Sequence, residues 1–169
     1  TLVGNAIAQK CEDTLFDYSH LAVAAAQDHV VTPALAKIVE ANTLMSGLGF
    51  ESGGLSGAHA IHDGLTILEE THDLTHGEKV AYGTLTQLML EGADKERYNK
   101  YFQFILSLGL PTTLADLHLE NVSDEKLLKA GEAACSEQDT MDRLPLAVST
   151  DDVAQAFRAV DAYSKQFLS

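Results

Sequence analysis

Apolar residues recur at intervals of three and four along almost the whole chain, and strict alternation of apolar and polar residues is rare. Intervals of three and four place side chains on one face of an α-helix, whereas a half-buried strand requires an interval of two. The pattern therefore predicts an all-α fold of six to seven helices joined by short turns. No linker, internal repeat or low-complexity stretch interrupts it, so we expect a single helical domain over residues 1–169.

Capping residues predict where several helices begin. Thr32-Pro33 combines a hydroxyl N-cap with a proline at the first helical position. Asp94 and Ser123 can each cap a further helix, and the run from Ser149 to Asp152 forms a capping box before the last one. These signals place helix starts along most of the chain.

The ends of the first two helices are predicted from weaker signals. The first helix is expected from Leu2 to His29, with a break near residues 17–19 as an alternative. Glycines at 47 and 49 predict the end of the helix that begins after Thr32. The pair Gly53-Gly54 predicts the opening of the next helix. The glycine-rich segment 47–54 is either a ligand-approaching loop at a helix N-terminus or a plain helix–helix connection, and it is not a dinucleotide fingerprint.

Charge and cysteine usage exclude several classes of protein. The chain carries 11 basic and 25 acidic residues, a formal net charge of −14, which disfavours nucleic acids and anionic membranes as partners. No apolar run is long enough to span a membrane. Cys11 and Cys135 match neither a disulfide framework nor a zinc knuckle, so we expect two reduced thiols in a cytoplasmic protein. Because a helical pattern starts already at Thr1, we expect a fragment of a longer protein.

Histidines and carboxylates gather in one window. Four of the seven histidines lie between residues 59 and 76, namely His59, His62, His72 and His76, among the carboxylates of Asp63, Glu69, Glu70, Asp73 and Glu78. Such a mixture suits a borderline divalent cation such as zinc. A turn separates the first and last of these histidines, so two crossing helices would bring them to one ion.

Spacing alone leaves other interpretations of this window open. Histidines near helix ends are common on protein surfaces, where they suit the helix dipole. The HExxH signature of zinc proteases is absent. Glu69-x-x-His72 matches half of a di-iron carboxylate site, which requires that pair twice, and the pair occurs once.

Three segments carry a resemblance to a known family. They are Gly47-Leu48-Gly49-Phe50-Glu51-Ser52-Gly53-Gly54-Leu55, His59-Ala60-Ile61-His62-Asp63-Gly64, and His76-Gly77-Glu78-Lys79-Val80-Ala81-Tyr82-Gly83-Thr84-Leu85. They resemble bacterial glycerol dehydrogenases, members of the iron-containing-type, or group III metal-dependent, alcohol dehydrogenases. The likeness extends to residues 30–35, 38–43 and 108–111 and covers nearly the whole chain.

The resemblance implies a two-domain enzyme in which an N-terminal α/β domain binds NAD and a C-terminal helical domain, of the dehydroquinate synthase-like type, holds a catalytic zinc. By position, the metal ligands of the family match His59 and His76. Phe50 matches an aromatic residue that lines the substrate pocket, and His62 falls near the nicotinamide as a candidate proton relay. The third zinc ligand of the family, an aspartate, and the dinucleotide loop lie upstream of this chain, so the NAD-binding domain is expected to be absent from it.

The implied reaction is the oxidation of glycerol, or a related polyol, to dihydroxyacetone, with zinc lowering the pKa of the substrate hydroxyl and hydride passing to NAD. The full-length enzyme is expected to be a homo-oligomer, and the chain alone is expected to be inactive. The alternatives are a non-catalytic helical assembly module and a truncated fragment without metal. A metal-storage bundle is disfavoured by the single Glu69-x-x-His72 pair.

Overall fold

The computed structural model describes all 169 residues, and every regular element in it is helical. The chain forms two compact units, residues 1–54 and residues 55–169. The sequence pattern, which predicts one domain, does not distinguish these units. No helix is both long and apolar enough to cross a membrane.

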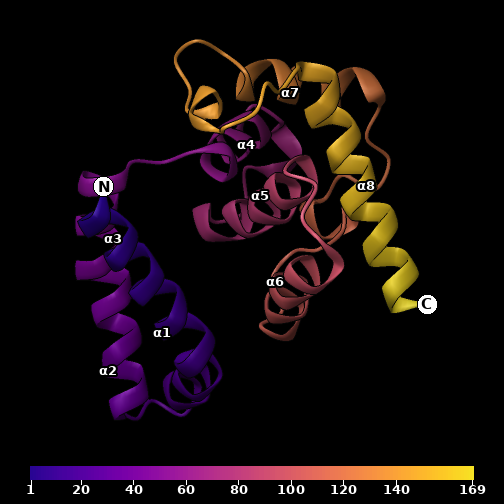
Figure 1. The fold of residues 1–169 in the computed structure, drawn as a ribbon. Helices are drawn as coiled ribbons and strands as arrows, with labels where there is room; N and C mark the ends of the chain where they lie inside the picture. The colour runs from indigo at the N-terminus through magenta and orange to yellow at the C-terminus, as the bar shows by residue number, and fades with distance from the viewer. The chain divides into compact units, whose positions relative to one another are not determined.

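The first unit is a pair of long helical stretches. The helix α1 spans Leu2–Gln27, and a second stretch is made of α2 (Pro33–Glu40), the π-helical turn η1 (Ala41–Met45) and α3 (Ser46–Gly53). The three parts of the second stretch follow one another without a break and pack along α1 (Figure 1). Thr32 accepts a hydrogen bond from the Leu35 amide, which confirms the predicted start of this stretch.

The predicted helix end at Gly47 and Gly49 is wrong. The helix continues to Gly53 and ends at Gly54, whose φ of 76° is one that glycine adopts readily. A glycine inside a helix costs only about 1 kcal/mol relative to alanine, and packing against α1 offsets that cost. A Cβ on Gly49 would lie 3.5 Å from the Ile7 side chain, an ordinary contact distance. The suggested break at residues 17–19 is also absent.

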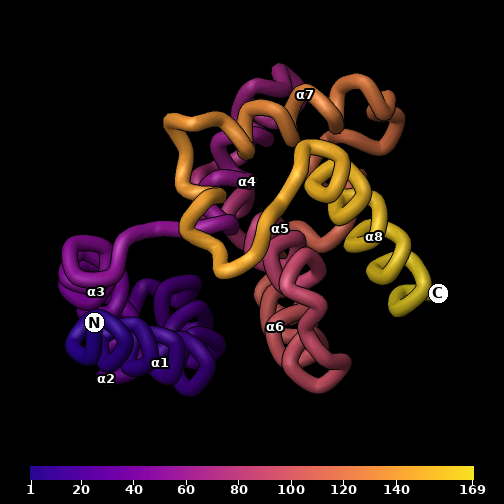
Figure 2. The backbone as a smooth tube through the Cα atoms, turned by 45° about the horizontal axis from the view of Figure 1, so that its top comes forward, coloured from indigo at the N-terminus to yellow at the C-terminus, as the bar shows by residue number.

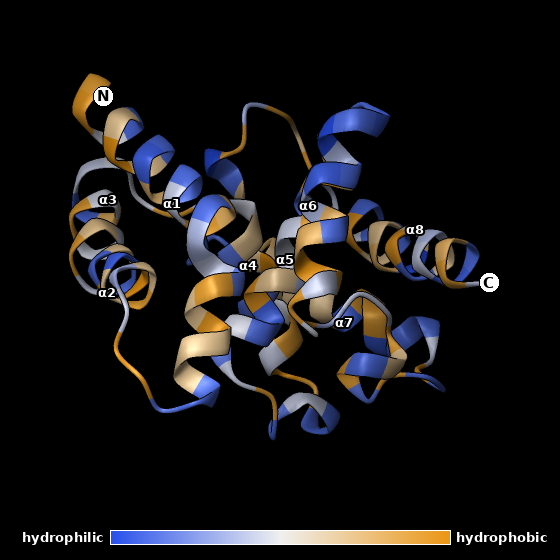
Figure 3. Cartoon of the chain, turned by 90° about the horizontal axis from the view of Figure 1, so that it is seen from below, coloured by the Kyte–Doolittle hydropathy of each residue, from blue (hydrophilic) through white to orange (hydrophobic).

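The first unit buries mainly small side chains. Its buried residues are Gly4, Thr14, Ser19, Ala22, Ala25 and Ala41. The helices therefore approach closely, and a Cβ on Gly4 would lie 3.0 Å from the carbonyl oxygen of Ser52. Large apolar residues remain outside, with Leu2 91% and Phe50 50% exposed. Figure 3 shows the first turn of α1 as an orange, hydrophobic end.

The second unit contains five α-helices and three short 3-10 turns. These are α4 (Gly57–Thr66), η2 (Glu69–Thr71), α5 (His76–Leu90), α6 (Lys95–Ser107), η3 (Ala115–Leu117), α7 (Asp124–Ala134), η4 (Met141–Arg143) and α8 (Thr150–Leu168). Asp94 and Ser123 cap α6 and α7, and Ser149 forms the predicted capping box with Asp152. With α1 and the continuous stretch α2–η1–α3 there are seven separate long helices, which confirms the predicted all-α fold of six to seven helices.

The core of the second unit surrounds α5. Figures 1 and 2 show α5 in the middle of this unit, and α4 and α8 both pack on it. Tyr82 of α5 is fully buried against Phe157 of α8, and its hydroxyl donates to the Phe157 carbonyl at 2.8 Å. A buried aromatic side chain whose hydroxyl has found an acceptor stabilises the core without an unpaired polar group.

Two glycines fix α4 against its neighbours. A Cβ on Gly83 of α5 would lie 2.5 Å from the carbonyl oxygen of Ala58 in α4. A Cβ on Gly64 of α4 would lie 2.3 Å from the carbonyl oxygen of Ala130 in α7. The Gln87 side chain also accepts a hydrogen bond from the Ala58 amide at 2.8 Å. No side chain larger than hydrogen fits at either glycine, so the backbones of these helices touch.

We expect Gly83→Ala to destabilise the protein by about 1–3 kcal/mol, the usual cost of forcing an extra carbon into a packed site. The matched control is Gly77→Ala in the same helix, because a Cβ there would meet nothing within 4 Å. Alanine is the better helix former by about 0.5–1 kcal/mol, so the control should be neutral or stabilising. Urea unfolding followed by circular dichroism measures both, and equal stabilities would contradict the close helix approach.

Candidate metal centre

Two helix starts position the predicted site residues. His59 lies in the first turn of α4, which begins after Ser56, and His62 lies one turn later. His76 is the first residue of α5, where Thr75 and Glu78 form a reciprocal capping box: the Thr75 hydroxyl accepts from the Glu78 amide and the Glu78 carboxylate from the Thr75 amide. This capping box holds His76 at the beginning of the helix. The sequence analysis missed it, although its Thr-x-x-Glu pattern is visible in the sequence.

The crossing of α4 and α5 brings three imidazole rings together. The ring centres of His59 and His76 lie 5.4 Å apart at an interplanar angle of 42°. Those of His62 and His76 lie 4.3 Å apart, and His76 Nδ1 is 3.1 Å from His62 Nε2. The fourth histidine of the window, His72, instead contacts the carbonyl oxygen of Thr66 through Nε2 at 3.1 Å.

The hydrogen bonds assign a protonation pattern to this cluster. The Asp63 carboxylate lies 2.8 Å from His62 Nδ1 and, when ionised, can only accept, so His62 Nδ1 carries a hydrogen. In a neutral His62 ring Nε2 then has a lone pair, and it accepts from His76 Nδ1–H. A neutral His76 ring that donates through Nδ1 keeps a lone pair on its Nε2. This is the tautomer that a metal-ligating histidine needs.

The surroundings of His59 and His62 favour their neutral forms. Burial is the main reason that the pKa of His59 lies below its ordinary value, and the neighbouring rings of His76 and His62 lower this pKa further. Burial also lowers the pKa of His62, against the opposing effect of the Asp63 hydrogen bond. The charge of Lys79, itself only 6% exposed, acts in the same direction as burial on His62. A neutral His59 ring can donate a lone pair to a cation, so the electrostatics around His59 fit metal ligation.

The spacing of His59 and His76 also fits a shared ion. Two imidazoles on one tetrahedral zinc, with Zn–N bonds of about 2.0–2.1 Å, have ring centres about 5 Å apart, close to the observed 5.4 Å. No group of three or more His, Cys, Asp or Glu side chains in the chain is arranged to hold a metal ion. An ion that contacts both histidines would therefore need further ligands to complete its coordination shell.

Phe50, the predicted substrate contact, lies in α3 of the first unit and is half exposed. The histidines belong to the second unit. The structure describes the two units separately, so the place of Phe50 beside the histidines stays a prediction.

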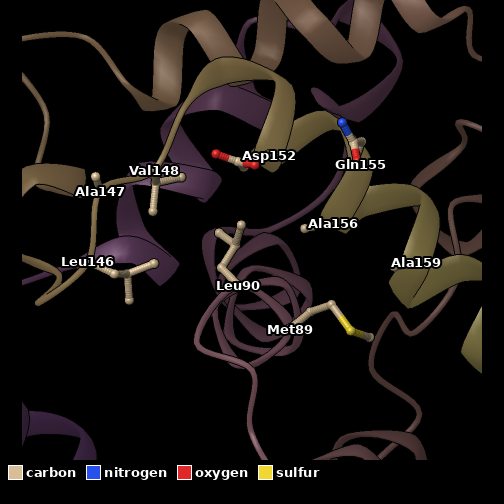
Figure 4. A pocket seen from close by; sticks show the side chains of 9 residues that line it. All are labelled: Met89, Leu90, Leu146, Ala147, Val148, Asp152, Gln155, Ala156 and Ala159. Carbon is tan, nitrogen blue, oxygen red and sulfur yellow. The ribbon is translucent and has the colours of Figure 1, made fainter.

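A cavity of about 450 Å³ lies elsewhere in the second unit, between the end of α5, the segment before α8, and α8 itself (Figure 4). Its lining is formed by Met89, Leu90, Leu146, Ala147, Val148, Asp152, Gln155, Ala156 and Ala159. The only carboxylate in it, that of Asp152, is bonded to Ser149 in the capping box of α8. None of the predicted site residues lines this cavity.

Several known proteins similar to this chain are glycerol dehydrogenases. The chain is 48% identical over 165 residues to a glycerol dehydrogenase of Thermotoga maritima, a match that covers 98% of this chain and 45% of the relative. A glycerol dehydrogenase of Escherichia coli is 45% identical over 163 residues, covering 96% of this chain and 44% of the relative. No family model matches the sequence.

The fold agrees with these relatives. The crystal structure of a probable glycerol dehydrogenase from Sinorhizobium meliloti matches with a TM-score of 0.95 and 45% identity, covering 98% of this chain and 47% of that chain. The predicted resemblance is therefore confirmed. The chain spans slightly less than half the length of the relatives it matches.

Proposed function

We propose that this chain is the helical, C-terminal half of an NAD-dependent glycerol dehydrogenase that oxidises glycerol to dihydroxyacetone. The ground is that the chain, along its whole length, is homologous to part of the glycerol dehydrogenases. The observation that carries this proposal is the convergence of His59 and His76 from two crossing helices. Both stand where the sequence resemblance places metal ligands. The proposal also includes a cytoplasmic location and a homo-oligomer for the full-length protein.

In this proposal His59 and His76 hold a zinc ion, and an aspartate from outside the chain is the third ligand. When bound, the ion supplies a Lewis acid that polarises the substrate hydroxyl. The chain contributes two imidazoles that the packing of α4 on α5 holds in place before any ligand arrives. Such preorganisation reduces the cost of ordering the site when it is filled.

His62 has an orienting role in this arrangement. Its Nε2 accepts from His76 and its Nδ1 donates to Asp63, so both ring nitrogens are engaged. This chain of contacts fixes the ring of His76 and its tautomer. The role of His62 as a proton relay, which the resemblance predicts, requires the contact with His76 to open so that Nε2 can receive a proton. Phe50 is proposed to line the substrate pocket.

We expect His59→Ala and His76→Ala in the full-length protein to lose bound zinc and most glycerol oxidation. The loss of activity should exceed about 100-fold, since removing a residue that only supports a ligand already costs 10- to 100-fold. His72→Ala is the matched control, because this exposed histidine contacts a backbone carbonyl instead of the other rings. Zinc per protein, by elemental analysis, and NADH formation are the two measurements. Full zinc content in either variant would refute the site.

The isolated chain of 169 residues is expected neither to oxidise glycerol nor to bind NAD. The reason is that the chain has no strand–glycine loop–helix unit to hold a dinucleotide and contains two metal-ligating histidines without a third ligand. NAD is titrated into the chain with zinc and glycerol present, and both heat of binding and absorbance of the reduced cofactor are recorded. Turnover near that of an intact glycerol dehydrogenase would show that the active site is misplaced.

A further inference from the structure

The segment that joins α7 to α8 is attached to the start of α4, the helix that carries His59. The Thr140 hydroxyl donates to the carbonyl oxygen of Ser56 at 3.0 Å, and an Arg143 nitrogen donates to that of Leu55 at 3.4 Å. Figure 2 shows this segment in orange beside α4. The attachment joins residues more than eighty positions apart in sequence, and it brings the segment to the end of α4 where the histidine cluster begins.

One carbonyl oxygen links this segment directly to His59. The backbone amide of His59 donates to the Ser56 oxygen at 3.1 Å, and the Thr140 hydroxyl donates to the same atom at 3.0 Å. Asp139 is held against this link, because its Oδ1 lies 3.4 Å from the same Thr140 hydroxyl. The electrostatics agree: burial and the two neighbouring rings lower the pKa of His59, while the carboxylates of Asp63 and Asp139 oppose that effect.

Asp139 has hydrogen-bonding capacity to spare. Its Oδ1 accepts from the Thr140 amide at 2.6 Å, which fixes the carboxylate, and no group of the protein is bonded to its Oδ2. The residue is half-buried. Asp63, the other carboxylate near His59, is bonded to His62. Asp139 is thus a fixed acceptor, near enough to His59 to act on its pKa, whose second oxygen has no partner within the protein.

We propose that Asp139 is a specificity-determining residue that accepts a hydrogen bond from a second hydroxyl of a polyol whose first hydroxyl lies at His59 and His76. This inference rests on the proposed function and names the residue that distinguishes a polyol from a simple alcohol. A hydroxyl that donates to a carboxylate forms a charge-assisted hydrogen bond. An alcohol with a single hydroxyl cannot form this bond and leaves the carboxylate without a partner, which is how a polar site rejects an analogue lacking one group.

The test compares glycerol with 2-propanol, which has a single hydroxyl, as substrates of the full-length protein. Asp139→Asn and Asp139→Ala should lower the ratio of kcat/KM for glycerol to kcat/KM for 2-propanol by about 10- to 100-fold, as expected for loss of a hydrogen bond to a charged group. Zinc content should stay at the wild-type value. Asp142→Asn is the matched control, because Asp142 lies in the same segment but is exposed, and its ratio should not change.

An unchanged ratio in both Asp139 variants would overturn this inference while leaving the proposed function intact. An equal fall in the Asp142 control would overturn it as well, because the effect would then arise from the charge of the segment as a whole. Loss of zinc from Asp139→Asn would show that the residue serves the metal instead of the substrate. A wild-type full-length protein that does not oxidise glycerol would overturn the proposed function and this inference together.

Discussion

The contact between the backbones of α4 and α5 is the constraint on which the histidine cluster depends. His59 and His62 project from one helix and His76 from the other, so their distances follow from how closely the two helices cross. Gly83 permits that approach, since its hydrogen faces the Ala58 carbonyl where a Cβ would lie at 2.5 Å. Interiors are packed like crystals and do not yield by an ångström. The geometry of the site is therefore set by a residue that takes no part in the chemistry.

Local signals predicted most helix starts correctly, because a cap is an interaction between residues three apart. Thr32, Asp94, Ser123 and Ser149 all accept the amide hydrogen bonds that their side chains predict. The predicted end of the helix at Gly47 and Gly49 was wrong because it depends on residues that are distant in sequence. Packing against α1 decides whether the helix continues there, and that contact is not visible in the local sequence.

The geometry of the candidate site also depends on contacts between residues that are distant in sequence. The clustering of histidines between residues 59 and 76 is visible in the sequence, and the resemblance selected His59 and His76 from it. That His62 bonds to both Asp63 and His76 depends on ring orientations set by the helix crossing. Asp139 lies eighty positions after His59, and no spacing rule connects the two residues. Only the attachment of its segment to Ser56, at the start of the helix that carries His59, brings them into the same region.

The two compact units differ in how they are stabilised, and this bears on what each can contribute to an active site. The second unit encloses large side chains such as Tyr82, Phe102 and Phe157, and burying a side chain of this size is favourable by about 1.5–3 kcal/mol. Its histidines therefore project from helices with a core of their own.

The first unit buries mostly alanine, serine, threonine and glycine, which supply much less stabilisation, and it keeps apolar side chains such as Val31 and Phe50 exposed. Exposed apolar residues of this kind are suited to contacts outside the unit. Under the proposed function, the second unit supplies His59 and His76 on helices that have a core of their own, and the first unit supplies Phe50 as an accessible aromatic side chain.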